Sequence, residues 1–226
     1  MNEEVHISTN GRLTMRQGMA KLVSMKKVFV FWDNSNIFIS AKTVAAEREG
    51  GDAAYQVKIQ FDQMLQLALA GRTLEYAIAV GSVPPPMRHV WNQLEHAGVK
   101  VELFERGGLS SREQAVDQAL QTHMLRKALD YNGTPGIAVM LTGDGAGYLD
   151  GVGFHADLER MHKKGWGVEV LAWERTCNPR LKQWANKIGV FIPLEHYYDG
   201  ITFTEDASGA LRRAKPLDLS KRKMTK

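Results

Sequence analysis

The sequence predicts an α/β protein with one doubly wound, mainly parallel sheet that is sandwiched by helices. Three observations support this fold. Short apolar runs rich in β-forming residues alternate with helical patterns along the chain. The runs at 27–32 and 136–141 are apolar without alternation, which is typical of strands buried on both faces. The 226 residues are enough for one well-buried domain of this class.

Strands and helices alternate from residue 27 through the first half of the chain. The apolar run 27–32 is the first predicted strand, and the helix predicted at 37–48 stops at a pair of glycines. Apolar residues at helical spacing over 55–70 predict a second helix, which Gly71 closes. The remaining elements expected in this half are a strand at 74–80, a helix at 87–96 and a strand at 99–104.

The second half continues the same alternation. A long helix is predicted over 112–131, because Ser111 and Gln114 resemble a capping box at its start. Strand 136–142 follows and leads into a glycine-rich stretch. The last expected elements are a helix at 155–164, a strand at 167–173, a helix at 179–187 and a strand at 190–193. The sequence does not determine the order of the strands in the sheet.

Composition excludes several classes of protein. Cys177 is the only cysteine, so an intrachain disulfide and a cysteine-based zinc site are excluded, and a reducing, cytoplasmic setting is expected. The chain shows neither a secretory signal pattern nor an apolar run long enough to span a membrane, so no membrane association is expected. The P-loop motif and the Gly-x-Ser-x-Gly elbow are absent, which argues against a P-loop NTPase and an α/β-hydrolase.

Charge divides the chain into an N-terminal arm at 1–25, a central domain at 26–203 and a basic tail at 204–226. The whole chain has a net charge of +4, whereas residues 212–226 hold seven Lys or Arg and one Asp, a net of +6. Such a tail could bind a polyanion, or it could be a solvated extension that aids solubility. The residues expected to contribute affinity for nucleic acid are Arg212, Arg213, Lys215, Lys221, Arg222 and Lys223.

Three aspartates are the strongest candidates for chemistry. Asp33 ends the first strand, Asp144 follows the strand at 136–142, and Asp117 lies near the start of the long helix. In a doubly wound sheet, the carboxyl ends of the strands border the ligand crevice. Gathered carboxylates repel one another, and a hard divalent cation is the usual reason to collect them. This pattern indicates metal-assisted phosphoryl chemistry.

Structural roles for the same residues stay open at this point. Asp33 could be a helix N-cap, with Asn34 and Asn36 filling the turn, and Asp117 could interact only with the helix dipole. In the functional reading, Asn36 orients a carboxylate or contacts a phosphate, and Thr142 holds a carboxylate or a water. Glu113 is either a supporting residue one turn before Asp117 or a solvated one.

Three motifs in order resemble the NYN domain, a family of PIN-like nucleases: Asp33-Asn34-Ser35-Asn36, Gln114-Ala115-Val116-Asp117 and Thr142-Gly143-Asp144-Gly145. The resemblance covers roughly 26–195 and includes the loop that begins at Gly81-Ser82. It implies a PIN-like fold and cleavage of RNA phosphodiesters with Mg²⁺ or Mn²⁺. By this resemblance Asp33, Asp117 and Asp144 are the catalytic and metal-holding residues, and Asn36 matches the polar residue after the first of them. Further candidates for contact with substrate or for support of the ligands are Asn34, Glu113, Thr142, Gly143 and Ser82.

Two departures from the family pattern leave an alternative open. Ala146 stands where the family often has a second acid, and His123 stands where a helical Asp often follows. Asp150 is a candidate fourth acid, although its spacing differs. The function expected from the resemblance is a metal-dependent ribonuclease that acts as an endoribonuclease on single-stranded RNA. The alternative is a weakened module that binds RNA or a partner, and the sequence leaves open whether the chain forms a homo-oligomer.

Overall fold

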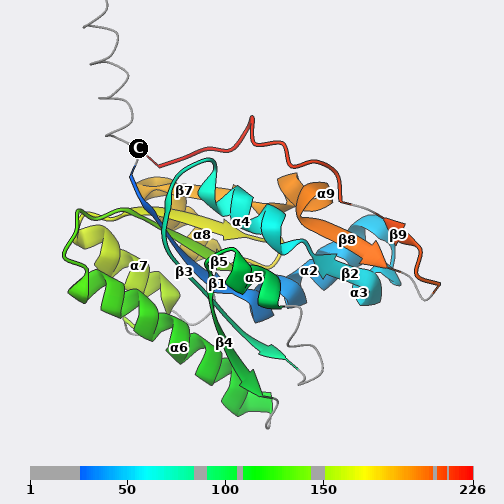
Figure 1. The fold of residues 1–226 in the computed structure, drawn as a ribbon, viewed down its shortest axis with the longest axis horizontal. Helices are drawn as coiled ribbons and strands as arrows, with labels where there is room; N and C mark the ends of the chain where they lie inside the picture. The colour runs from blue at the N-terminus through cyan, green and yellow to red at the C-terminus, as the bar shows by residue number, and fades with distance from the viewer. Residues whose placement is uncertain are drawn as a thin grey trace, which may run out of the picture.

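A six-stranded sheet forms the centre of the protein (Figure 1). The computed structural model describes residues 26–83, 91–105, 109–143, 151–205, 208–212 and 214–225. All neighbouring strands of this sheet pair in parallel. The predicted doubly wound sheet is therefore confirmed. In spatial order its strands are β4 (Lys100–Glu105), β3 (Leu74–Val83), β1 (Val28–Asp33), β5 (Ile137–Thr142), β6 (Gly167–Ala172) and β7 (Val190–Pro193).

Helices cover both faces of the sheet. Successive residues of β1 alternate between two cores, so Trp32 packs on one face and Phe31 on the other. Every residue of β1 is buried, which explains its uninterrupted apolar run. One face carries α2 (Asn34–Glu49), α4 (Phe61–Leu69), α5 (Asn92–His96) and α9 (Tyr198–Ile201); the other carries α6 (Leu109–Asp130), α7 (Phe154–Lys163) and α8 (Pro179–Ile188).

A second, small sheet replaces part of a predicted helix. The expected helix at 55–70 is wrong, because the segment contains α3 (Ala53–Gln56), β2 (Val57–Ile59) and then α4. Val57 and Ile59 are β-branched and buried, and β2 pairs antiparallel with β8 (Thr202–Glu205). This partner lies far along the chain, so a local helical pattern could not reveal it. β8 pairs in turn with β9 (Leu211–Arg212).

The strands β3 and β4 extend beyond the carboxyl edge of the central sheet. The last pair between β1 and β3 is Asp33 with Val80, whereas β3 and β4 stay paired as far as Val83 and Glu105. The predicted strand at 74–80 was therefore three residues too short. Of the helix expected at 87–96, α5 is observed, and residues 84–90 lie outside the described part. The extended β3–β4 pair forms a wall beside Asp33.

The C-terminal residues pack onto the domain. After η2 (Leu194–Tyr197), α9, β8 and β9, the chain returns along the molecule to its opposite end (Figure 1, red). Leu217 and Leu219 pack against the core on the α2 face. The described residues beyond 203 are thus part of the folded body and not a separate tail. The expected arm at 1–25 lies outside the described residues, and within the described part no helix has the length and apolar character to cross a membrane.

Candidate functional site

Asp33 is fixed at the carboxyl end of the central strand β1. Its side chain is wholly buried and caps α2. Oδ1 accepts a hydrogen bond from the backbone N of Asn36 at 3.0 Å, and Oδ2 accepts one from Asn36 Nδ2 at 2.6 Å. The N-cap role considered for Asp33 is therefore real. The same two bonds also fix the orientation of the carboxylate, so the structural role does not exclude a chemical one.

Asn34 places a second hard oxygen in the same turn. The residue is 8% exposed, and its Oδ1 is buried with no hydrogen-bond partner among the described residues. A buried amide oxygen without a partner is costly, so it calls for a donor or a cation. Carboxylate and amide oxygens are ligands that suit Mg²⁺ and Mn²⁺. The first turn of α2 therefore fits a hard cation by its chemistry.

The strand that precedes Asp144 lies directly beside β1, as the candidate site requires. Trp32 pairs with Leu141, so Asp33 and Thr142 are the next residues on neighbouring strands. Thr142 is wholly buried and lies on the same face of the sheet as Met140, which is the α6 face. Asp144 follows two residues later. Asp144, Ala146 and Asp150 lie outside the described residues.

Gly143 brings the end of β5 into contact with the first turn of α2. A Cβ at this position would lie 2.1 Å from the carbonyl oxygen of Asn36, so only glycine allows this approach. The hydroxyl of Thr176 donates to the Gly143 carbonyl at 2.8 Å, and Trp173 Nε1 donates to the Ile37 carbonyl at 2.9 Å. The segment after β6 therefore ties both sides of the site together. Sequence reasoning missed Thr176 and Trp173 because their role depends on the strand order.

Asp117 lies on α6, the helix that covers this face of the sheet. It is half-buried, and Val116 beside it packs into the core with Phe31 of β1. One turn later, the side-chain oxygen of Gln121 accepts a hydrogen bond from Gly153 N at 3.2 Å, which joins α6 to the start of α7. The region around Asp117 is thus linked to the chain that follows Asp144. The side chains of Glu113 and Ser82 lie outside the described part, although their backbones belong to α6 and β3.

His123 does not take the place of a metal-holding acid. Its Nδ1 lies 2.9 Å from the hydroxyl of Tyr76, and its Nε2 lies 3.0 Å from Oε2 of Glu102. Since a carboxylate only accepts, Nε2 donates to Glu102 and Nδ1 of the neutral ring accepts from Tyr76. Both ring nitrogens are therefore engaged by the sheet.

Three of the six predicted nucleic-acid contacts at the C-terminus are engaged within the domain. Lys215 pairs with Asp199 at 2.7 Å, and Arg222 is buried against Glu169 at 2.6 Å. The expectation of RNA affinity for Arg222 does not fit this position, because its charge is enclosed. Arg212 pairs with Glu49, Lys221 lines a cleft of about 450 Å³, Lys223 is exposed and Arg213 lies outside the described residues.

The described residues do not by themselves form an acidic cluster. No group of three or more His, Cys, Asp or Glu side chains converges among them. Asp33 and Asn34 supply oxygens from one turn, and Asp117 lies on the helix that covers the same face. A complete acidic site therefore depends on Asp144, whose strand the structure places beside β1.

Comparisons with known proteins agree with this architecture. The family model of the NYN domain matches residues 27–193. The structure is similar to that of a protein of unknown function from Vibrio parahaemolyticus, with a TM-score of 0.54 and 16% sequence identity over 75% of this chain and 93% of that one. At this identity the likeness concerns the fold alone. No match was found among curated proteins.

Proposed function

Because the chain belongs to the NYN domain family, within the PIN-like nuclease superfamily, we propose that it is a metal-dependent ribonuclease. One observation carries the proposal. Asp33 is buried at the end of the central strand, with both carboxylate oxygens oriented by Asn36, directly beside the strand that leads to Asp144. A carboxylate held in this way at the crevice of a parallel sheet is suited to a cation and a phosphate.

Some residues of the site would hold a cation, and others orient the residues that hold it. Asp33, Asp117 and Asp144 would hold Mg²⁺ or Mn²⁺, with the amide oxygen of Asn34 as a further donor. When bound, such a cation supplies Lewis-acid activation of water and neutralises charge on the scissile phosphate. Asn36 keeps the Asp33 carboxylate in one orientation, so no reorganisation is needed when substrate arrives.

Thr142 and Gly143 position the second side of the crevice. Thr142 is buried next to the end of β1, and Gly143 packs against the Asn36 carbonyl. The β3–β4 wall extends past the edge and limits access to the site from one side. The substrate that we propose for this site is an extended, single-stranded RNA.

Substitution of Asp33 tests the proposal. Asn and Asp are nearly equivalent N-caps, and a rotation of the Asn36 amide lets its oxygen accept from the new NH2 group, so Asp33→Asn should keep the free energy of unfolding within about 0.5 kcal/mol. We expect it to abolish Mn²⁺-dependent cleavage of single-stranded RNA. Asp62→Asn, on an exposed acid in the first turn of α4, is the matched control and should cleave normally. Wild-type cleavage by Asp33→Asn would refute the proposal, and a large loss of stability would assign Asp33 to capping alone.

A weakened binding module is the second candidate function. The observations that favour it are Ala146 in the glycine-rich segment and the engagement of His123 by Tyr76 and Glu102, which leave two expected acids without replacements. Such a module would bind single-stranded RNA with the affinity of a nuclease but would not cleave it in Mg²⁺ or Mn²⁺. Binding and cleavage measured on the same wild-type preparation separate the two functions.

A further inference from the structure

Three basic side chains gather around Tyr76 of β3. Lys127 Nζ lies 4.2 Å from the centroid of its ring, and Lys100 Nζ lies 5.4 Å from it. Burial raises the pKa of Tyr76, and the charge of Glu102 raises it further. The charge of Arg126 lowers this pKa, so Arg126 is the third cation that acts on the tyrosine. We call Lys100, Arg126 and Lys127 the Tyr76 cation cluster.

The tyrosine at the centre of this cluster is held in place. Its hydroxyl bonds to His123 of α6, and His123 bonds in turn to Glu102 of β4. This chain of hydrogen bonds joins α6 to two strands of the sheet. The ring therefore offers a fixed surface to both lysine ammonium groups, each within the range of a cation–π contact.

Two nearby carboxylates already have other partners. Glu102 accepts from His123 at 3.0 Å, and Glu75 pairs with Lys27 at 2.7 Å, although the charge of Lys127 also acts on Glu75. Among the described residues, no member of the Tyr76 cation cluster forms an ion pair with a carboxylate. The C-terminal cations Lys215 and Arg222 are paired in contrast. Three like charges around one ring repel one another, and a bound anion would relieve that repulsion.

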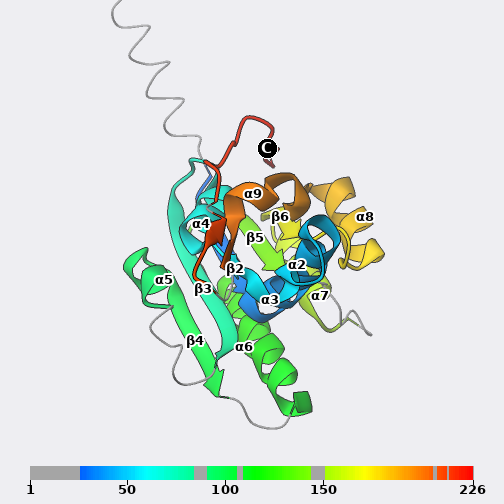
Figure 2. The ribbon, with the colours of Figure 1, turned by 90° about the vertical axis from the view of Figure 1, so that its right-hand side faces the viewer.

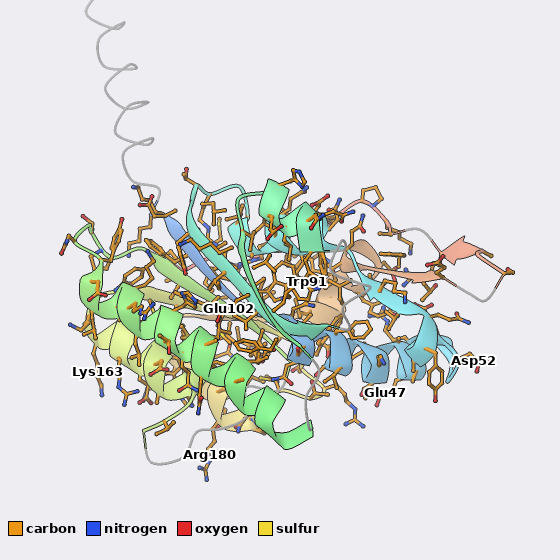
Figure 3. The ribbon with its side chains drawn as sticks, turned by 60° about the horizontal axis from the view of Figure 1, so that its bottom comes forward. Glu47, Asp52, Trp91, Glu102, Lys163 and Arg180 are labelled. Carbon is orange, nitrogen blue, oxygen red and sulfur yellow. The ribbon has the colours of Figure 1, made fainter. Side chains whose placement is uncertain are left out.

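Two members of the cluster, Arg126 and Lys127, lie on the helix that also carries Asp117. Lys127 is ten residues further along α6, which corresponds to about 15 Å along the helix axis. β4 is the edge strand of the sheet and α6 runs beside it (Figure 2), and Figure 3 labels Glu102 on β4 at this surface. Lys100 and Arg126 are exposed there. A polyanion that occupies the site at the strand ends could therefore continue over this surface.

We propose that the Tyr76 cation cluster binds the phosphate backbone of single-stranded RNA at a distance from the cleavage site. The proposal rests on the proposed ribonuclease function, because RNA is the polyanionic substrate of that function. Phosphate contacts of this kind add affinity and position the strand without reading its sequence. They also make binding depend on salt, since each contact releases counterions.

The test compares two triple variants in RNA binding. Affinity for a mixed-sequence, single-stranded RNA is measured over a KCl series in EDTA, where no divalent cation supports cleavage. Lys100→Gln, Arg126→Gln and Lys127→Gln together should reduce the slope of log affinity against log salt by about 2, because each lost single-strand contact contributes roughly 0.7.

The control triple removes the same residue types from the exposed surface of α7 and α8 (Figure 3). It consists of Lys163→Gln, Lys164→Gln and Arg180→Gln, none of which removes an ion pair among the described residues. We expect its salt slope to stay close to that of the wild type. An equal fall in both triples would show a general charge effect and overturn the assignment of this surface.

A double variant tests the proposal without changing the half-buried residue of the cluster. Lys127 is half-buried, so its removal could disturb the packing around Tyr76, whereas Lys100 and Arg126 are exposed. The double variant Lys100→Gln with Arg126→Gln should keep the wild-type melting temperature and reduce the slope by about 1.4. An unchanged slope in this folded variant overturns the proposal.

The salt dependence of RNA binding tests the surface proposal separately from the ribonuclease function. If the wild type cleaves RNA but the cluster variants bind with an unchanged salt slope, the surface proposal fails and the ribonuclease function stands. If the wild type does not cleave but the cluster variants lose the predicted slope, the surface proposal stands and the ribonuclease function fails. A wild type that binds no RNA in EDTA overturns the surface proposal.

Discussion

Single residues at the carboxyl edge of the sheet serve structure and function together. Asp33 caps α2 and at the same time presents a carboxylate at the end of the central strand. The cap requires the side chain to accept from Asn36, and this bond also sets the direction of the carboxylate. For this reason, a residue that fits a structural rule is not thereby excluded from chemistry.

Gly143 is the residue whose replacement should separate packing from charge. Gly143→Ala adds no charge, but its Cβ would meet the Asn36 carbonyl oxygen at 2.1 Å and Ser40 Oγ at 2.5 Å. We expect a loss of about 1–3 kcal/mol in the free energy of unfolding, with a fall in cleavage that exceeds the fraction unfolded. Urea unfolding and cleavage rates check this.

Gly51→Ala is the control for this substitution. A Cβ at Gly51 meets no atom within 4 Å, so the variant should unfold and cleave like the wild type. If Gly143→Ala is as stable and active as Gly51→Ala, the close contact between the end of β5 and α2 is not needed for the site.

At the scale of elements, α7 connects the segment after Asp144 to the core of the α6 face. His155 in its first turn is buried and packs against Trp184 of α8, with ring centroids 4.8 Å apart. Burial lowers the pKa of His155, although the charge of Glu159 acts in the opposite direction. The neutral imidazole is therefore the form that the folded protein favours.

Acid should weaken the anchoring of α7. The unfolded chain binds a proton to His155 near its ordinary pKa of 6.5, whereas the folded protein does so only at lower pH. Folding stability from this group is thus complete above pH 6.5 and falls as the pH drops from there toward the lowered pKa of the folded state. Urea unfolding between pH 7.5 and 5.5 should show this decline.

His155→Phe should flatten the pH dependence, because it keeps an aromatic ring against Trp184 but cannot bind a proton. His162, which is exposed and also near Trp184, provides the comparison through His162→Phe. Should His155→Phe lose stability with acid as steeply as the wild type does, the decline arises from other groups.

At the scale of the whole molecule, the C-terminal segment closes the domain through a buried ionic cluster. Glu169 of β6 is wholly buried and pairs with Arg72 at 2.7 Å and with Arg222 at 2.6 Å. Its Oε1 also accepts from Thr225 N at 2.8 Å. Burial alone would raise the pKa of Glu169, but the bonds and charges of the two arginines lower it.

Removal of the shared anion should destabilise the protein strongly. Glu169→Gln leaves two buried guanidinium groups without their charge partner, and we expect a loss of about 3–5 kcal/mol in the free energy of unfolding. Lys223→Gln, on an exposed neighbour of Arg222, should change stability by less than about 0.5 kcal/mol. Equal stability of the two variants would show that the cluster does not hold the C-terminal segment.

Several features could be predicted from the sequence because they depend on local pattern. Strands buried on both faces leave uninterrupted apolar runs, so the six parallel strands were found within three residues at each end. Asp33 was recognisable because it follows such a run directly. The site residues Asp117 and Asp144 remain predictions from the motifs, and the structure shows only that β1, β5 and α6 are neighbours.

Only the tertiary structure decided what depends on contacts between distant segments. The pairing of β2 with β8, the burial of Arg222 against Glu169 and the gathering of Lys100 with Lys127 around Tyr76 each join segments that are far apart in sequence. A basic residue looks the same in sequence whether its charge faces solvent or a buried carboxylate. Local pattern therefore determined the individual strands and the place of Asp33 at the end of one of them. Long-range packing decided the order of the strands and which basic side chains are free of an ion pair among the described residues.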